Sequence, residues 1–196
     1  MIGKQSPAFA RRACRTAFAM AALALTPLDA LTLDELLLDP EMTPKRFAAL
    51  FENFEYDYHP EVKPARAFLA SRRGDCDDYA ILADYVLGRK NYDTRMIHVR
   101  MVGRIAHAVC YVRESKAYLD YNNRRVFFNL QRSGMSLREI ATRVADSFEA
   151  NWTTASEFTY DYGEDRKQFG ATVVKTDPRS SDPDITSPRR RPPGES

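Results

Sequence analysis

A cysteine at the expected start of a helix constrains this chain more than any other feature of the sequence. Segment 74–80 reads GDCDDYA, and Asp75 suits the N-cap because its side-chain oxygen accepts hydrogen bonds from the first N–H groups of a helix. The run 79–87 favours a helix, and Gly88 predicts its end. Four residues at helical spacing place the cysteine on the side that faces the domain: Cys76, Ala80, Ala83 and Leu87.

The position of Cys76 favours a thiolate, but its neighbours oppose one. The N–H groups and the partial positive charge at a helix N-terminus stabilise a thiolate. The carboxylates of Asp75, Asp77 and Asp78 act in the opposite direction, so a reactive thiol here requires a nearby imidazole. The alternative is that Cys76 is a small buried core residue.

Residues 1–30 have the pattern of a secretory signal peptide. Four basic residues precede a short apolar run at 17–25, and small residues lead to Ala30, after which we expect cleavage. The apolar run is too short for a permanent membrane helix. We therefore expect a periplasmic or secreted protein with no stable membrane insertion.

Composition bounds the remainder of the chain. Without residues 1–30 there are 25 basic and 26 acidic residues, so the net charge changes from +2 to −1, which leaves no basic field for nucleic acid. Residues 31–176 are sufficient for one domain with a hydrophobic core. Residues 177–196 are rich in Pro, Ser, Arg and Asp and predict a disordered tail.

The pattern between these ends predicts helices followed by short antiparallel strands, which is an α+β domain. Thr43-Pro44 predicts a helix as far as about Phe54, and Pro64 opens a second one over 65–72. A capping box at Ser136–Glu139 predicts a late helix, whose apolar stripe extends to Phe148. Alternation predicts four strands, at 94–102, 105–112, 117–121 and 126–130, and two edge strands at 158–162 and 169–175.

His107 and Cys110 are candidates for contact with Cys76. Because side chains alternate along a strand, His107 and Cys110 take opposite faces of the strand 105–112. A Cys76–Cys110 disulfide, which an oxidising compartment favours, and a Cys76–His107 pair are therefore alternatives. His59 lies among charged and turn residues, and we expect it at the surface.

Asp120 is placed by the same reasoning. A two-residue turn at 114–115, or a four-residue turn at 113–116, pairs Val109 with Asp120 in an antiparallel hairpin. His107 is then the diagonal neighbour of Asp120 on the same face. A carboxylate there fixes the tautomer of the imidazole and stabilises its charged form.

These residues resemble the transglutaminase-like superfamily, and within it the bacterial transglutaminase-like cysteine proteinases. The likeness rests on segment 74–80, on His107 in a strand and on Leu119-Asp120 in the next, and it covers about 64–123. It implies a papain/transglutaminase-like fold with the catalytic helix packed on an antiparallel sheet. It also implies that Cys76 is the nucleophile, His107 the base and then the acid, and Asp120 the orienting group.

The same resemblance implies a calcium site. In the periplasmic subgroup, carboxylates flanking the cysteine take part in calcium binding, and Asp75 and Asp77 match those positions. The alternative is that Asp75 and Asp77 only cap and line the helix start. In either case, we expect the reaction itself to require no cofactor. The chain departs from the family after His107, where Ala108-Val109 stands in place of the aromatic residue of many members.

The leading hypothesis is an exported cysteine hydrolase that cleaves a peptide or isopeptide bond of a protein or peptide substrate through an acyl-enzyme. The Cys76 N–H is expected to bind the oxyanion, with a second donor from Tyr56 or Tyr58. Two alternatives share the fold, namely a protein-crosslinking acyltransferase and a non-catalytic binding domain. A third is a redox or disulfide-stapled protein that uses Cys76 and Cys110.

Overall fold

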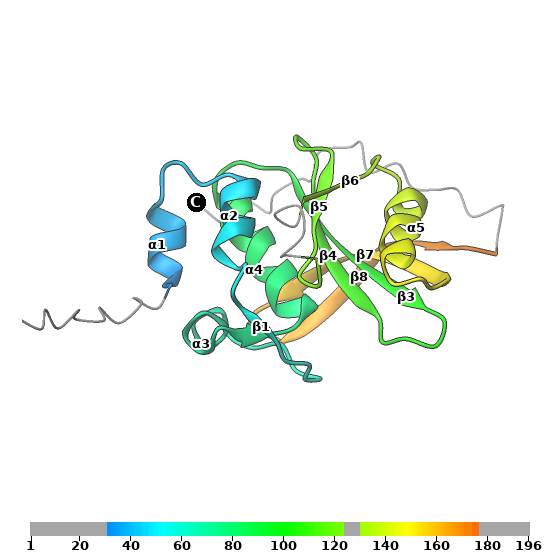
Figure 1. Cartoon of the computed structure of the whole chain (residues 1–196), viewed down its shortest axis with the longest axis horizontal. Helices are drawn as coiled ribbons and strands as arrows, with labels where there is room; N and C mark the ends of the chain where they lie inside the picture. Colours follow the sequence, from blue (N-terminus) through cyan, green and yellow to red (C-terminus); the bar gives the residue numbers. More distant parts are fainter. Residues whose placement is uncertain (1–30, 124–129, 177–196) are drawn as a thin grey trace, which may run out of the picture.

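A six-stranded sheet with helices on both sides forms the centre of this α+β domain (Figure 1). The computed structural model describes residues 31–123 and 130–176. The strand order is β6-β5-β4-β3-β7-β8, and each neighbouring pair is antiparallel. The strands are β3 (Thr94–Met101), β4 (His107–Val112), β5 (Ala117–Leu119), β6 (Leu130–Arg132), β7 (Trp152–Asp161) and β8 (Arg166–Val174).

Helices precede the sheet in the chain, and one helix interrupts it. They are α1 (Leu33–Leu38), α2 (Pro44–Leu50), α3 (Ala65–Ser71), α4 (Cys76–Arg89) and α5 (Leu137–Ser147). The short strands β1 (Glu55–Tyr56) and β2 (Arg73–Gly74) pair in parallel directly before α4. No helix in the described ranges is both long enough and apolar enough to cross a bilayer.

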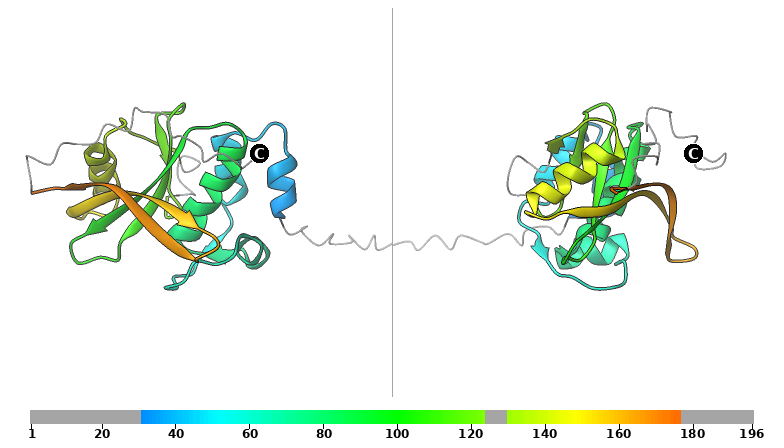
Figure 2. Two further views of the ribbon diagram at one scale, coloured as in Figure 1. Left: turned by 180° about the vertical axis from the view of Figure 1, so that it is seen from behind. Right: turned by 90° about the vertical axis from the view of Figure 1, so that its right-hand side faces the viewer.

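Two hydrophobic cores lie on opposite faces of the sheet, and alternation along β4 shows the division. Ala108 and Cys110 belong to the core that contains α4, whereas Val109 and Tyr111 belong to the core that contains α5. Figure 2 shows α5 on one side of the sheet and α4 on the other. The expected α+β fold, with the cysteine-bearing helix packed on an antiparallel sheet, is confirmed.

The start of α4 is fixed by a close approach of three elements. Asp75 is the N-cap, and its Oδ1 accepts hydrogen bonds from the N–H groups of Asp77 (2.9 Å) and Asp78 (3.3 Å). Asp78 completes a capping box by accepting the Asp75 N–H at 3.0 Å. A Cβ on Gly74 would lie 2.5 Å from both the Asp78 carboxylate and the Phe68 ring, so only glycine fits before the cap.

Several expected helix ends were wrong. Gly88 does not end α4, because Asn91 takes the left-handed conformation (φ 68°) and the helix continues through Arg89. The helix begun at Pro44 ends at Leu50, before Phe54. At α5, Ser136 accepts the Glu139 N–H as expected, but the Glu139 carboxylate binds the Gly134 N–H at 2.7 Å, so the expected capping box is absent.

Strand ends also differ from expectation. β4 begins at His107 because its pairing with β3 stops at the pair Val99–His107, and Ile105 is 60% exposed in the preceding loop. β7 begins at Trp152 and is an interior strand between β3 and β8, not an edge. Of the strand expected at 126–130, residues 126–129 lie outside the described residues, as do the expected signal peptide 1–30 and tail 177–196, and β6 starts at Leu130.

Candidate active site

Cys76 is the first residue of α4 and belongs to the hydrophobic core that contains this helix. Its side chain is 5% exposed, and it packs with the stripe residues that the sequence indicated. Because Asp75 accepts the N–H groups of Asp77 and Asp78, the N–H of Cys76 is the first-turn donor that the cap does not take. This places a thiol and a backbone donor at the same helix end.

His107 and Asp120 form a buried pair. The distance from His107 Nε2 to Asp120 Oδ1 is 2.8 Å, and the side chains are 4% and 0% exposed. The hairpin that joins them has the four-residue turn 113–116, and Cys110 faces Leu119 in its register. Extending this register by one step puts Val109 opposite Asp120, as the sequence predicted, although Asp120 follows β5 rather than lying within it.

Asp120 is held by three donors. Its Oδ1 accepts the His107 ring nitrogen and the Asn122 N–H (2.9 Å), and its Oδ2 accepts the Asn123 amide at 2.7 Å. Burial alone would raise the pKa of Asp120, but the charge of His107 and these hydrogen bonds lower that pKa below its usual 3.8. Asp120 is therefore an ionised carboxylate at neutral pH.

His107 interacts with Asp120 on one side and with Cys76 on the other. Burial alone would lower the pKa of His107, but the charge of Asp120, the sulfur of Cys76 and hydrogen bonds with both raise it well above 6.5. Since Nε2 faces Asp120, Nδ1 is the ring nitrogen left for the thiol. The structure thus brings together all three residues that the sequence singled out.

His107 and Cys110 take opposite faces of β4 as expected, but Cys76 is not restricted to one of them, so this part of the prediction was wrong. Cys110 is fully buried in the same core as Cys76, whereas His107 shares the parity of Val109 on the other face. His107 still interacts with Cys76 because it is the first residue of β4, at the end of the sheet where α4 also begins. Neither Cys76 nor Cys110 forms a disulfide in the described part of the chain, so the disulfide alternative is not supported.

A cleft opens beside His107. It has a volume of about 290 Å³, and Tyr56 and Phe148 contribute aromatic walls. The remaining lining residues are Met101, Gly103, Arg104, Ile105, Ala106, His107 and Asn122. The Phe148 ring lies 4.8 Å from the His107 ring, edge to face. The sequence predicted Phe148 only as part of the stripe of α5 and Ile105 only as part of a strand, and it indicated neither as a cleft residue.

Tyr56 lines this cleft and interacts electrostatically with Cys76. Burial, together with the charges of Cys76 and Asp75, raises the pKa of Tyr56 to about 12. The phenol therefore keeps its proton at neutral pH and remains a hydrogen-bond donor. Tyr58, the other candidate that the sequence offered, is not among the residues lining this cleft.

His59 is not an ordinary surface residue, contrary to expectation. Its Nε2 lies 3.2 Å from the buried Oδ2 of Asp78, and its side chain is 21% exposed. Asp78 also accepts the Lys63 N–H at 2.7 Å. Burial raises the pKa of Asp78 to about 6, and the hydrogen bonds and His59 limit the rise. The Lys63 hydrogen bond holds the loop before α3 against the first turn of α4, and the His59 ring faces Asp78 without a hydrogen bond from its Nε2 to any described residue.

The acidic start of α4 brings two carboxylates and the thiol close together, and two of the carboxylate oxygens are already engaged in other contacts. Oxygen and sulfur atoms of Asp75, Cys76 and Asp77 lie within 4.8 Å of one another. Calcium takes six to eight oxygen ligands, and a thiol is not one of them. Asp75 Oδ1 already accepts two N–H groups, and Asp77 Oδ2 is 2.5 Å from the ammonium of Lys167. Asp77 Oδ1 is buried without a hydrogen-bond partner among the described residues, so this oxygen remains available to a cation.

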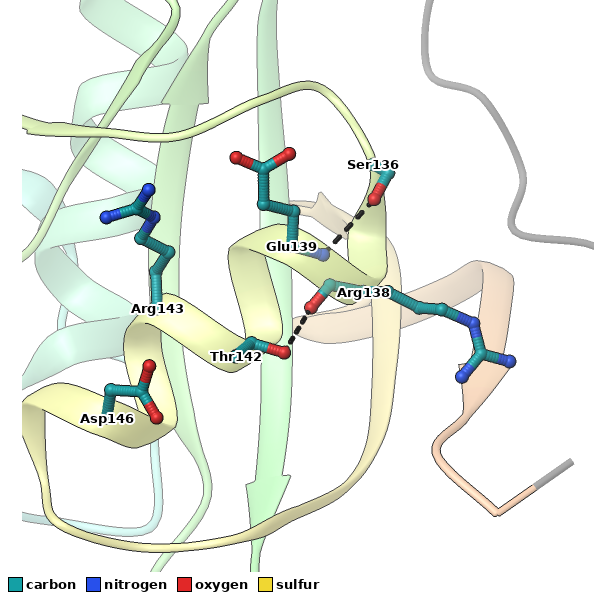
Figure 3. A pocket seen from close by; sticks show the side chains of 6 residues that line it. All are labelled: Ser136, Arg138, Glu139, Thr142, Arg143 and Asp146. Carbon is teal, nitrogen blue, oxygen red and sulfur yellow. Dashed lines mark hydrogen bonds between the residues drawn. The ribbon is translucent and has the colours of Figure 1, made fainter. Parts of the chain in front are cut away.

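A second hollow lies along α5 (Figure 3). Its lining residues are Ser136, Arg138, Glu139, Thr142, Arg143 and Asp146. The Ser136 hydroxyl accepts the Glu139 N–H, and the Thr142 hydroxyl donates to the Arg138 carbonyl at 2.8 Å. Neither hydroxyl has an imidazole beside it in this lining, and the hollow has the character of a polar helix surface.

The fold and the site together define an α+β domain with a helix-terminal cysteine beside a buried histidine–aspartate pair. No family model and no curated protein matches the chain. Among solved structures, the chain is similar to Legionella pneumophila LapG, with a TM-score of 0.42 and 14% identity over 72% of this chain and 73% of that one. The EGTA-treated form of the same protein has a TM-score of 0.42 and 15% identity, over 70% and 75%. The chemistry of this chain is therefore inferred from its own residues.

Proposed function

We propose that this protein is a cysteine hydrolase that cleaves a peptide or isopeptide bond through a Cys76–His107–Asp120 triad. The observation that carries the proposal is the position of His107, which interacts with Cys76 and binds a carboxylate 2.8 Å away. A nucleophile, a base and a group that orients the base are the parts required for acyl transfer. The interaction of one imidazole with both groups favours this proposal over a cysteine that only fills the core.

Each step of the reaction has a residue to perform it. The Cys76 sulfur attacks the carbonyl carbon and forms a C–S bond, while the carbonyl oxygen takes the negative charge. The His107 imidazolium then gives its proton to the leaving nitrogen, and the C–N bond breaks to release an amine and leave a thioester. Water next attacks the thioester as His107 removes its proton, the C–S bond breaks, and a carboxylic acid leaves with the thiolate restored.

Two donors are available for the oxyanion. One is the N–H of Cys76, which the Asp75 cap leaves free of its own hydrogen bonds. We assign the second role to the phenol of Tyr56, since it borders the cleft with His107 and holds its proton at neutral pH. Such donors stabilise charge that develops only in the transition state.

The cleft suits a polypeptide substrate. Its walls are largely apolar, with Tyr56, Met101, Ile105 and Phe148 around the imidazole, and Arg104 supplies a positive charge at the rim. Ile105 is 60% exposed and Tyr56 is 44% exposed, so both are accessible to a side chain that enters from outside. The proposed substrate is an extended segment of a protein or peptide with an apolar residue next to the cleaved bond.

Alkylation with iodoacetamide tests the proposal without knowledge of the substrate. In the native protein we expect Cys76 to be carbamidomethylated and Cys110, which is fully buried, to be protected. His107→Ala should slow the reaction of Cys76 at pH 6 at least about tenfold, because the imidazolium favours the reactive thiolate. Peptide mapping by mass spectrometry identifies the modified residue. Equal labelling of Cys76 with and without His107 would contradict the proposed pair.

We also propose that the protein acts in the periplasm or outside the cell. The proposal rests on the basic, apolar and small-residue pattern of residues 1–30. N-terminal sequencing of the exported protein should show a chain that begins at Leu31. An exported chain that still begins at Met1 would refute the proposed cleavage.

A further inference from the structure

Three carboxylates crowd the first turn of the helix that carries the thiol. Asp75 and Asp78 are buried at 2% and 3% exposure, and the Asp77 side chain is 22% exposed. Burial and the charge of Asp77 raise the pKa of Asp75. Negative charges placed this close to each other and to a thiolate require a positive charge nearby.

Lys167 provides a positive charge at this place from the far end of the chain. Its ammonium is 2.5 Å from Asp77 Oδ2, across 90 residues of sequence, and its side chain is 22% exposed. The ammonium also lies 5.9 Å from the centre of the Phe158 ring. Lys63 is engaged by Asp57 and the Arg73 carbonyl, and the His59 ring faces Asp78.

The Lys167–Asp77 pair is not the only described contact between the β7–β8 hairpin and α4. In addition to the Lys167–Asp77 pair, the ring of Tyr162 meets the ring of Tyr85 of α4 edge to face, with centres 5.9 Å apart. Phe158 of β7 belongs to the same core as Cys76. Figure 2 shows the two long strands of the hairpin, yellow to orange, with the turn between them at one end.

We propose that the Lys167 ammonium is the built-in counter-ion of the Asp75–Asp77 pair, in the place of a divalent cation, and that it joins the β7–β8 hairpin to the nucleophile-bearing end of α4. The donor set supports this role, because one oxygen of Asp77 is bound to Lys167 and one of Asp75 is bound to the helix N–H groups. The site then keeps its structure without calcium. The inference extends beyond the proposed hydrolysis, because it concerns the stability of the start of α4 and of its contact with the hairpin, whether or not the protein turns over a substrate.

Thermal unfolding of the residue 31–196 protein in 1 mM calcium chloride and in 1 mM EGTA is the first test. We expect the same Tm in both buffers to within about 1 °C, because no calcium is needed at the helix start. A Tm that rises in calcium and falls in EGTA would overturn the proposal, since it would show that a divalent cation, not Lys167, neutralises the pair.

A double-mutant cycle supplies the second test. Lys167→Met keeps the apolar stem and removes the charge, and it should lower Tm by about 3 °C. In an Asp77→Asn background the same change should have almost no effect, because its partner charge is already gone. An equal loss of Tm in both backgrounds would overturn the proposal.

Lys175 offers a matched control on the same hairpin. Its ammonium also lies over an aromatic ring, 5.7 Å from the centre of Trp152, but it binds the neutral Asn151 side chain at 3.0 Å. Lys175→Met should change Tm by the same amount with or without Asp77→Asn. Since all of these measurements report folding, an inactive protein would leave their outcome intact, and the two proposals fail separately.

Discussion

Replacing Cys76 with alanine is expected to lower kcat/KM by at least about 10,000-fold, because no acyl-enzyme can form without the attacking thiol. His107→Ala should cause a loss of the same order, since neither the thiol nor its base supports turnover alone. Hydrolysis of a small activated ester, p-nitrophenyl acetate, measures both variants without a known substrate. An initial burst of nitrophenol in the parent protein, absent from both variants, would identify the acyl-enzyme.

The fold should survive this change at Cys76. The side chain is small and only 5% exposed, and alanine continues the small-residue stripe of α4. The loss of stability should stay near 1 kcal/mol, which thermal unfolding measures. A folded Cys76→Ala protein that retains the burst would refute the assignment of the nucleophile.

Cys110→Ala is the matched control, because it removes an identical thiol from the same core. Cys110 is fully buried and faces Leu119 across the hairpin. Its replacement should cost some stability through a small cavity while leaving the burst unchanged. If Cys110→Ala abolished the burst and Cys76→Ala did not, the assignment of Cys76 as the nucleophile would be wrong.

Local rules were sufficient to predict much of the site. The cap at Asp75 and the small stripe of α4 follow from residue types within a few positions. The pairing of Asp120 with the strand of His107 follows from the length of one turn, because register passes through a tight hairpin without outside help. These features depend on contacts between residues close in sequence.

Features that depend on distant contacts could not be predicted in this way. Parity along β4 separates His107 from the α4 core, yet its place at the strand's first residue lets it reach Cys76 around the end of the sheet. Nothing local indicates where that strand begins, because Ile105 continues the apolar pattern although it is exposed. The contacts of His59 with Asp78 and of Lys167 with Asp77 span 19 and 90 residues, and neither leaves a periodic signal.

Asp120→Asn is expected to reduce kcat/KM by about 100- to 1,000-fold, less than the loss of Cys76 or His107. An asparagine oxygen can still accept the His107 and Asn122 donors, and its NH2 group can face Asn123 if that amide turns over. The geometry is then kept and the charge is lost. Asn123→Ala is the control, because it removes one donor from the carboxylate but leaves its charge, and it should cost less than about tenfold.

The pH dependence distinguishes an electrostatic role of Asp120 from a merely structural one. Asp120 is a main cause of the raised pKa of His107, so the pKa of His107 should fall in Asp120→Asn, and the alkaline limb of the kcat/KM profile should move to lower pH. The free energy of unfolding should also depend on pH through the same pair. His107, with its raised pKa, stabilises the fold below about pH 6.5 and loses that contribution as pH rises through its folded pKa.

Asp120, with its lowered pKa, contributes above about pH 3.9 and loses its contribution as pH falls through its folded pKa. Both contributions are therefore complete between about pH 4 and 6.5, and Asp120→Asn should be most destabilising there, by about 3 kcal/mol. Urea unfolding at pH 5.5 and at pH 9 measures the difference. A variant with an unmoved alkaline limb and equal destabilisation at both pH values would show that the carboxylate charge does not act on His107.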